Sequence, residues 1–315
     1  MNENILEKKN CLITGATGGL GKQIAIELAK KNCNLFLTAR QNKKLEKLNG
    51  ELEKINKNNL IKYKHCNLQE TQELDGLIQK IHDEFNSIDI LVNCAGVFPV
   101  SPISQSTLEQ YDSCMNLNVR IPFVLSKEFS KDMIKNRWGR IVNVASSGAY
   151  NGLKNTVIYR SSKHALLGFS RAIHAELKEH NVRTFCVSPG PIKTSMGHEI
   201  IKNENPDEDF MSFMNPVEIA EFILHIISYD NEMISEEVRL SRSLHNELKE
   251  FNVRTFCISP GPIKTNIGKD IIKKENPNEN YDTFMKPNEI AEFITFAISF
   301  DNNLISPEVR LGRIK

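Results

Sequence analysis

The stretch Cys11-Leu12-Ile13-Thr14-Gly15-Ala16-Thr17-Gly18-Gly19-Leu20-Gly21 decides the fold. Its apolar start predicts a buried strand, and the apolar positions that follow at helical spacing predict a helix: Ile24, Ala25, Leu28 and Ala29. Between the two, glycines let the backbone approach a pyrophosphate closely, and the helix N-terminus offers free N–H groups. The spacing is Gly-x-x-x-Gly-x-Gly, not the Gly-x-Gly-x-x-Gly of the dinucleotide fingerprint, so the turn alone is weak evidence.

Further short apolar runs alternate with helical patterns along the chain. They cover residues 35–37, 88–92, 141–144 and 182–187, and each is bounded by polar residues, glycine or proline. Continuous apolar runs of this length are typical of parallel strands that are buried on both faces. The alternation therefore predicts an α/β protein with a parallel sheet.

A phenol and an ammonium occur four residues apart in Tyr159-Arg160-Ser161-Ser162-Lys163, and Ser146 lies thirteen residues before Tyr159. Apolar residues spaced as on a helix predict that 159–177 is helical, so Tyr159 and Lys163 share one face. A free tyrosine titrates near ~10, and we expect the ammonium to lower the phenol's pKa. A Tyr four residues before a Lys is commonly only a surface pair, so other motifs must support a catalytic interpretation.

Those motifs resemble the short-chain dehydrogenase/reductase superfamily over about residues 8–240. Six elements occur in that family's order and spacing: 14–21, Asn93-Cys94-Ala95-Gly96, Asn118, Ser146, Tyr159-x-x-x-Lys163 and Pro189-Gly190. The resemblance implies one doubly wound, Rossmann-like parallel sheet that holds a nicotinamide cofactor at the carboxyl ends of its strands. It also implies catalytic roles. Ser146 would bind the substrate carbonyl, Tyr159 would transfer the proton, Lys163 would bind the ribose and tune Tyr159, and Asn118 would hold a relay water.

The same resemblance implies the cofactor contacts. They are Gly15, Thr17, Gly19, Leu20, Gly21, Arg40, Asn67, Asn93, Ala95, Gly96, Tyr159, Lys163, Pro189, Gly190, Ile192 and Thr194. Two positions depart from the family pattern. Asn67 replaces the usual Asp at the adenine, and Cys94 replaces the commoner second Asn. We expect cofactor binding to tolerate both.

Arg40 decides which cofactor we expect. An acidic residue after the second strand would bind the ribose 2′-hydroxyl of NAD, but this chain has Arg40 there and no acid before Glu46. A planar guanidinium suits the 2′-phosphate of NADP. The sequence therefore favours NADP(H), although Arg40 could also simply begin the solvated helix expected over 43–54.

The composition of the chain indicates which binding partners and which cellular compartment to expect. A chain of 315 residues, 40% hydrophobic and 25% charged, can bury a full core, and no apolar run reaches the ~20 residues of a membrane span. The net charge of +1 argues against a nucleic-acid or anionic-membrane surface. The seven scattered cysteines and the N-terminus without an apolar signal core are typical of a reduced, cytoplasmic protein, and no metal site is expected. A homo-oligomer is possible.

A tandem repeat is the unusual feature. Residues 170–240 recur at 241–311, an offset of 71, and 47 of the 71 positions are identical. We therefore expect a reductase domain over 1–240 and a partial duplicate over 241–315. Copy one follows the predicted catalytic helix directly, whereas docking copy two in its place would loop out about 71 residues with an exposed apolar face. Copy one should complete the sheet. Copy two could mimic an oligomer contact, be loosely attached, or have no selected role.

Two functions remain open. The first is an NADP-dependent carbonyl reductase or alcohol dehydrogenase, and the second is a cofactor-binding protein whose catalysis is impaired by the appended copy. The set Asn118, Ser146, Tyr159 and Lys163 favours the first. The chain resembles 3-oxoacyl-acyl-carrier-protein reductases and reductases of small 3-hydroxy acids. Segment 195–214 would form a wall of the substrate site, and its mixed character does not identify the substrate.

Overall fold

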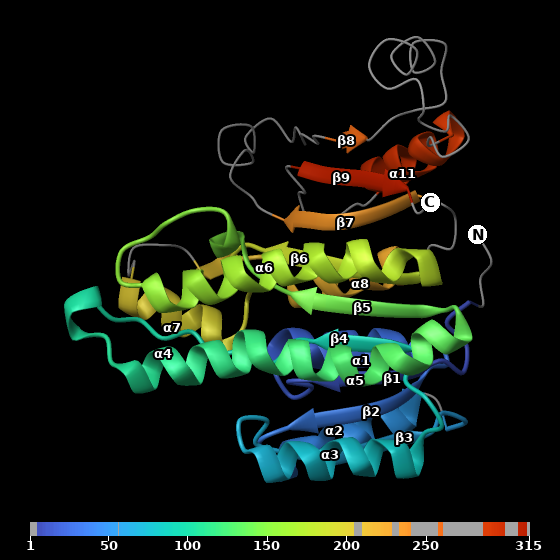
Figure 1. Cartoon of the computed structure of the whole chain (residues 1–315), viewed down its shortest axis with the longest axis horizontal. Coiled ribbons are helices and arrows are strands. Elements are labelled where there is room, and N and C mark those ends of the chain that lie inside the picture. Colours follow the sequence, from blue (N-terminus) through green and yellow to red (C-terminus); the bar gives the residue numbers. More distant parts are fainter. Residues whose placement is uncertain are drawn as a thin grey trace.

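The protein is described by a computed structural model that covers residues 5–55, 57–204, 210–228, 233–240, 258–260, 286–299 and 308–313. Within these residues, one sheet organises the chain (Figure 1). Its strands are β1 (Asn10–Thr14), β2 (Asn34–Ala39), β3 (Ile61–His65), β4 (Ile90–Asn93), β5 (Gly139–Val144), β6 (Val182–Pro189), β7 (Met233–Leu240), β8 (Ile258–Pro260) and β9 (Glu308–Arg313).

The strand order is β3-β2-β1-β4-β5-β6-β7-β9-β8. Neighbours from β3 to β7 pair in parallel, which confirms the expected parallel sheet of Rossmann-like type. From β1, the strands β2 and β3 are added on one side of the sheet, and the strands from β4 onward are added on the other side. The carboxyl ends of β1 and β4 therefore meet at a topological switch point, where ligands of such sheets bind.

Helices cover both faces of the sheet. α1 (Gly19–Lys30), α2 (Asn42–Ile55) and α8 (Pro216–Ser228) share one apolar cluster with the sheet, and α3 (Thr71–Glu84) and α5 (Ile121–Asn136) share another on the opposite face. α6 (Val157–Leu177) lies beside α5 on that second face (Figure 1). The remaining helical segments are η1 (Ile103–Gln105), α4 (Leu108–Met115), η2 (Asn116–Arg120), η3 (Ser147–Ala149), η4 (Lys178–His180), α7 (Ser195–Glu204), η5 (Phe210–Ser212) and α11 (Pro287–Ser299).

A buried arginine ties α8 to the middle of the sheet. Arg140 on β5 is fully buried, and its Nε donates to the carbonyl of Ile227 at 3.1 Å. Ile227 belongs to the last turn of α8, where free carbonyls and the negative end of the helix dipole favour a cation. The guanidinium also lies 4.4 Å from the centre of the Trp138 ring. This contact fixes copy one of the repeat to the central strands.

The C-terminal repeat adds to the same sheet. β9 pairs with β7 in antiparallel fashion, and β8 pairs with β9 (Figure 1). The edge of β7 therefore gives copy two a strand with which to pair. Residues 241–257, 261–285 and 300–307 of the repeat lie outside the described part of the chain.

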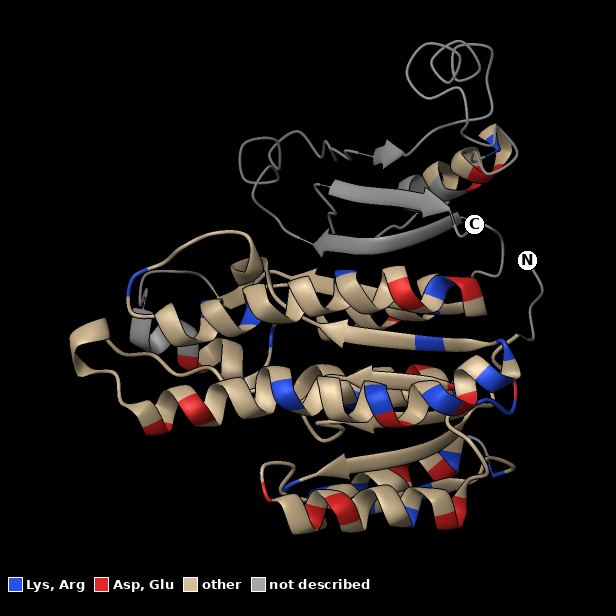
Figure 2. Cartoon of the chain, in the orientation of Figure 1, with Lys and Arg blue, Asp and Glu red and all other residues tan. Residues whose placement is uncertain are grey.

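Charges of both signs are interspersed on the face of α3 and α5 that Figure 2 shows. Several of these charges pair, as Lys131 does with Glu128 at 2.7 Å and Lys62 with Glu84 at 2.9 Å. Such mixed surfaces do not concentrate the positive potential that nucleic acids need. Among the described residues, no helix combines the length and apolarity needed to cross a bilayer.

Candidate active site

The glycine turn after β1 forms a close-packed cradle. Gly15 has φ +65°, and an added Cβ there would lie 2.9 Å from the backbone of Ala95. A Cβ on Gly21 would overlap the carbonyl oxygen of Gly15. No residue in the first turn of α1 is acidic. The N-terminus of α1 therefore keeps its positive dipole end for an anion, as a dinucleotide phosphate requires.

Thr14 joins this turn to the loop after β4. Its hydroxyl accepts hydrogen bonds from the N–H groups of Cys94 and Ala95, both at 3.1 Å. Because the hydroxyl is buried, it holds the Asn93-Cys94-Ala95-Gly96 loop against Gly15. The sequence did not assign Thr14 a role. Its signal was a hydroxyl directly after the apolar run Cys11-Leu12-Ile13.

Asn93 points into the sheet. Its Nδ2 donates to Asn143 Oδ1 at 2.8 Å, and Asn143 Nδ2 donates to Ser170 Oγ at 2.9 Å. This buried chain braces β4, β5 and α6. The side chain of Asn93 therefore positions the loop that follows it. The cofactor contact that we expected of Asn93 remains a prediction.

Asn118 lies in η2, which is a π-helical turn: the N–H of Ile121 bonds to the carbonyl of Asn116. Its amide is fully used. Oδ1 accepts from the Val97 N–H at 2.9 Å, while Nδ2 donates to the Val97 carbonyl at 3.0 Å and to Ser162 Oγ at 2.9 Å. Asn118 thus joins the loop after β4 to the helix that carries Tyr159. π-helical turns of this kind are frequent at functional sites.

Ser146, Tyr159 and Lys163 lie together at the carboxyl end of β5. The Ser146 hydroxyl hydrogen-bonds the phenol of Tyr159 and accepts from the Gly148 N–H at 3.1 Å. Lys163 is buried, its Nζ donates to the carbonyl of Val144 at 2.9 Å, and it lies 5.7 Å from the centre of the Tyr159 ring. The helix α6 presents the phenol and the ammonium one turn apart, as its spacing predicted.

The pKa of Tyr159 differs from our expectation. Burial raises the pKa of the phenol to about 12, and the hydrogen bond from Ser146 opposes that rise. Removing the phenol from water disfavours its anion, and Lys163 does not offset this because its ammonium is directed to the Val144 carbonyl. Burial also lowers the pKa of Lys163 itself. At neutral pH the phenol of Tyr159 is therefore protonated.

Copy one of the repeat closes the cradle from the other side. Thr194 follows the Pro189-Gly190 turn and precedes α7, and its Oγ1 accepts from the Gly197 N–H at 3.1 Å. A Cβ added to Gly19 would overlap the methyl carbon of Thr194. Ile192 and Met214 form a parallel bridge that supports this segment. Thr194 of copy one thus lies against the glycine turn, and the cofactor contacts expected of Pro189, Gly190 and Ile192 remain predictions.

Arg40 and Asn67, which we expect at the adenosine end of the cofactor, follow β2 and β3. Arg40 is exposed directly after β2 and makes no hydrogen bond or ion pair with any described residue. Asn67, two residues beyond β3, accepts from the Gln69 N–H at 3.4 Å, and its own N–H donates to Glu73 Oε2 at 2.8 Å. Both follow neighbouring strands of the sheet, whose carboxyl ends meet at one edge. Arg40 is free to bind an anion.

A model of the family described as short chain dehydrogenase matches residues 9–205. The chain belongs to this family. The match covers well over half of the chain and includes the glycine turn, Asn118, Ser146, Tyr159, Lys163 and Thr194. It ends inside copy one and before copy two.

Relatives of this short-chain dehydrogenase are oxidoreductases. A 3-oxoacyl-acyl-carrier-protein reductase of Buchnera aphidicola is 31% identical over 61% of this chain and 76% of its own length. Among solved structures, an actinorhodin polyketide ketoreductase with NADPH has a TM-score of 0.65 at 25% identity, covering 70% of this chain and 90% of that one. Levodione reductase, at 23% identity, has a TM-score of 0.67 over 73% and 95% of the two chains.

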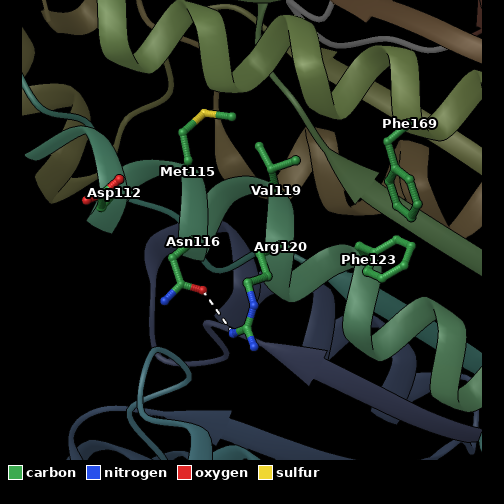
Figure 3. A pocket seen from close by; sticks show the side chains of 7 residues that line it. All are labelled: Asp112, Met115, Asn116, Val119, Arg120, Phe123 and Phe169. Carbon is green, nitrogen blue, oxygen red and sulfur yellow. Dashed lines mark hydrogen bonds between the residues drawn. The ribbon is translucent and has the colours of Figure 1, made fainter. Parts of the chain in front are cut away.

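A hollow of about 480 Å³ lies where residues of α4, η2, α5 and α6 come together (Figure 3). It is lined by Asp112, Met115, Asn116, Val119, Arg120, Phe123 and Phe169. The rings of Phe123 on α5 and Phe169 on α6 are 6.0 Å apart, and half of the Phe123 side chain is exposed. Asn118, Ser146, Tyr159 and Lys163 do not line the hollow, and Asn118 of η2 is buried against Val97. We therefore do not assign it to the catalytic chemistry.

Two further residues of the site escaped the sequence analysis. Ser162 donates to the Tyr159 carbonyl at 2.6 Å and accepts from Asn118. Phe98 packs edge-on against the Tyr159 ring, with 4.3 Å between the ring centres. Together they restrict how the phenol can move. Ser162 stands inside the Tyr159-x-x-x-Lys163 motif, but only the fold reveals that it faces Asn118.

Proposed function

We propose that the protein is an NADP(H)-dependent reductase that interconverts a carbonyl compound and its secondary alcohol. The observation that carries this is the grouping of Ser146, Tyr159 and Lys163 beside the glycine cradle of α1. The hydroxyl and the phenol are hydrogen-bonded to each other, so both can reach one substrate oxygen. Family membership and the NADPH that accompanies the actinorhodin ketoreductase support the same conclusion.

The cradle suits a dinucleotide on its own geometry. Gly15, Gly19 and Gly21 leave no room for side chains where the backbone must approach a pyrophosphate. The free guanidinium of Arg40 stands where the second strand ends, the place at which dinucleotide folds recognise the 2′ position. We infer that Arg40 binds the 2′-phosphate of NADP. When bound, this cofactor supplies the hydride that reaches the carbonyl carbon.

The side chains of the site would handle the oxygen and its proton. Ser146 would donate a hydrogen bond to the substrate carbonyl, which polarises it. Tyr159, neutral at physiological pH, would donate its proton to the oxygen as negative charge develops there. Lys163, held in place by the Val144 carbonyl, would bind the ribose of the cofactor beside Tyr159.

Asn118 would take part in the proton relay through its place in the π-helical turn and not through its side-chain amide. Its amide is occupied by Val97 and Ser162, so a relay water would bind the widened π-helical turn and not the amide. Such a water could return a proton to Tyr159.

Tyr159→Phe tests the chemistry. We expect reduction of ketones by NADPH to fall by ~10²–10⁴-fold, because the variant keeps the ring and loses only the proton donor. NADPH binding, followed by fluorescence titration, should stay within about twofold, since the phenol hydroxyl serves the reaction. Tyr111→Phe on α4 is the matched control, because Tyr111 is 44% exposed and lies outside the site. Turnover within tenfold of the parent in Tyr159→Phe would contradict the proposed role.

The alternative, a cofactor-binding protein blocked by the appended copy, finds no support in the described structure. β8, α11 and β9 lie beyond β7, and Thr194 of copy one occupies the place beside Gly19. Turnover of NADPH with a small panel of ketones would distinguish the two functions directly.

For the substrate, we propose a chemical class and no individual compound. This class is small ketones or acyl thioesters, in line with the 3-oxoacyl-acyl-carrier-protein reductase relative. Self-association also remains a proposal, supported by the exposed aromatic surface around Phe123, and light scattering would measure it.

A further inference from the structure

We propose that the C-terminal repeat is an intramolecular edge cap: its strand β9 occupies the edge of β7 at which a second copy of this chain would otherwise pair. The proposal is independent of the reaction. It assigns a role to a segment that the family model does not reach.

The register between β7 and β9 is that of a two-fold symmetric contact. Val238 lies opposite Val309, which is its own repeat 71 positions later. On either side, Glu237 lies opposite Arg310, the repeat of Arg239, and Arg239 lies opposite Glu308, the repeat of Glu237. These three pairs are related by a two-fold axis through the Val238–Val309 pair. This reciprocity defines an isologous interface between identical subunits. Beyond a register shift between Ser235 and Glu237, the strand continues opposite Gly312 and Arg313, which lie outside the repeat.

The residue types at these positions make the contact self-complementary. The segment Glu-Val-Arg, read antiparallel to itself, places an acidic residue opposite a basic residue on both sides of the central valine. Opposite charges directly across an antiparallel pair stabilise it, and like charges destabilise it. The strand would therefore recognise a second copy of itself as well as it recognises its repeat.

With the repeat in place, the sheet ends at a strand that pairs poorly with further chains. Without β9, the sheet would end at the eight residues of β7, a ready template for another strand. With the repeat in place, the sheet ends at β8, which has three residues and finishes at Pro260. A short edge strand that contains proline pairs poorly with further chains.

A second contact accompanies the strand. α11 lies 71 residues after α8, with the same length, and its Ile290 is buried in the same apolar cluster as Ile219 and Ile223 of α8. The repeat therefore adds a helix as well as a strand, as a second subunit would. Pairing within the chain wins because a tethered partner has an effective concentration in the millimolar range.

Truncation after residue 240 tests the proposal. By light scattering, we expect the truncated chain to form assemblies with twice as many copies as the full chain. In an assembly of truncated chains, Glu237→Arg places an arginine opposite Arg239 of the other copy, and this happens twice in each contact. The association constant should therefore fall about tenfold. The double variant Glu237→Arg/Arg239→Glu restores opposite charges and should restore it. Circular dichroism and NADPH binding verify folding in each case.

Two outcomes would overturn the proposal. One is a folded truncated chain with the same number of copies as the full chain, and the other is an assembly that Glu237→Arg does not weaken. If the truncated chain does not fold, Val309→Pro in the full chain decides, because proline disrupts an inner strand while the rest of the repeat is retained. If the assembly contains more chains in Val309→Pro but not in Val309→Thr, the edge cap is supported. If the number of chains in Val309→Pro equals that of the parent, the proposal is refuted.

Discussion

The first prediction concerns the pKa of Tyr159, which would set the pH range of the reaction if Tyr159 is the proton donor that we propose. Burial raises that pKa to about 12, so the phenol stays protonated below this value and loses its proton as pH rises through it. A proton donor should therefore persist through neutral and moderately alkaline pH, and kcat/KM for reduction should not fall from this group below about pH 10. Ultraviolet difference titration of the parent against Tyr159→Phe measures the group directly. A tyrosinate that forms below about pH 9 in the parent alone would show that Lys163 tunes the phenol as first expected.

Arg40 makes the second prediction, on cofactor choice. Arg40→Asp should lower kcat/KM with NADPH by at least ~10-fold, because each charge-assisted hydrogen bond contributes about 1.5–3 kcal/mol. The same change should raise the relative efficiency with NADH, since a carboxylate accepts from the ribose hydroxyl. Lys43→Asp, in the exposed first turn of α2, is the control for net charge. An equal preference ratio in Arg40→Asp and the parent would assign the 2′-phosphate to another group.

The residues that the sequence identified are those whose chemistry is local. A glycine that needs φ +65° or a Tyr and a Lys one helical turn apart can be read from spacing. Asn93 and Ser162 could not be placed in this way, because their partners Asn143 and Asn118 come from other elements. The pKa of Tyr159 also depends on how much water the fold excludes, and that is a tertiary property.

At the scale of elements, the contact of α1 with the segment after β6 makes the third prediction. Gly19→Ala should weaken NADPH binding about tenfold, because the new Cβ overlaps Thr194 and forces the two elements apart. Thr194→Ser removes the methyl carbon but keeps the hydroxyl that caps α7, so it should recover most of the loss in the double variant. Thr265→Ser, the same change in copy two, should recover nothing. Rescue by Thr265→Ser would place copy two at the glycine turn.

The sequence predicted some strands of the sheet and missed others. β1, β2, β4, β5 and β6 were evident as apolar runs, because strands buried on both faces have no polar side. β3 was missed, since this edge strand alternates lysines with apolar residues and none of its residues is fully buried. The antiparallel β9 was missed for another reason. A repeated strand pattern does not show that the repeat pairs with its original.

The whole molecule makes the last prediction, which concerns what copy two adds to the reductase. Residues 5–240 contain the glycine turn, Asn118, Ser146, Tyr159 and Lys163, and Arg140 holds α8 to β5 within the same range. The chain truncated after residue 240 should therefore bind NADPH within about threefold of the full chain and keep its turnover, because no group of the site is removed.

Deletion of 170–240 is the matched counterpart, because it joins copy two to α6 in register. Copy two retains the Pro-Gly turn and a threonine four residues after its glycine, so this chain should also bind NADPH. Activity in both chains would show that direct connection to α6, and not a difference in sequence, assigns copy one to the site. An inactive truncated chain, together with a harmless Thr194→Ala in the full chain, would show instead that copy two completes the site.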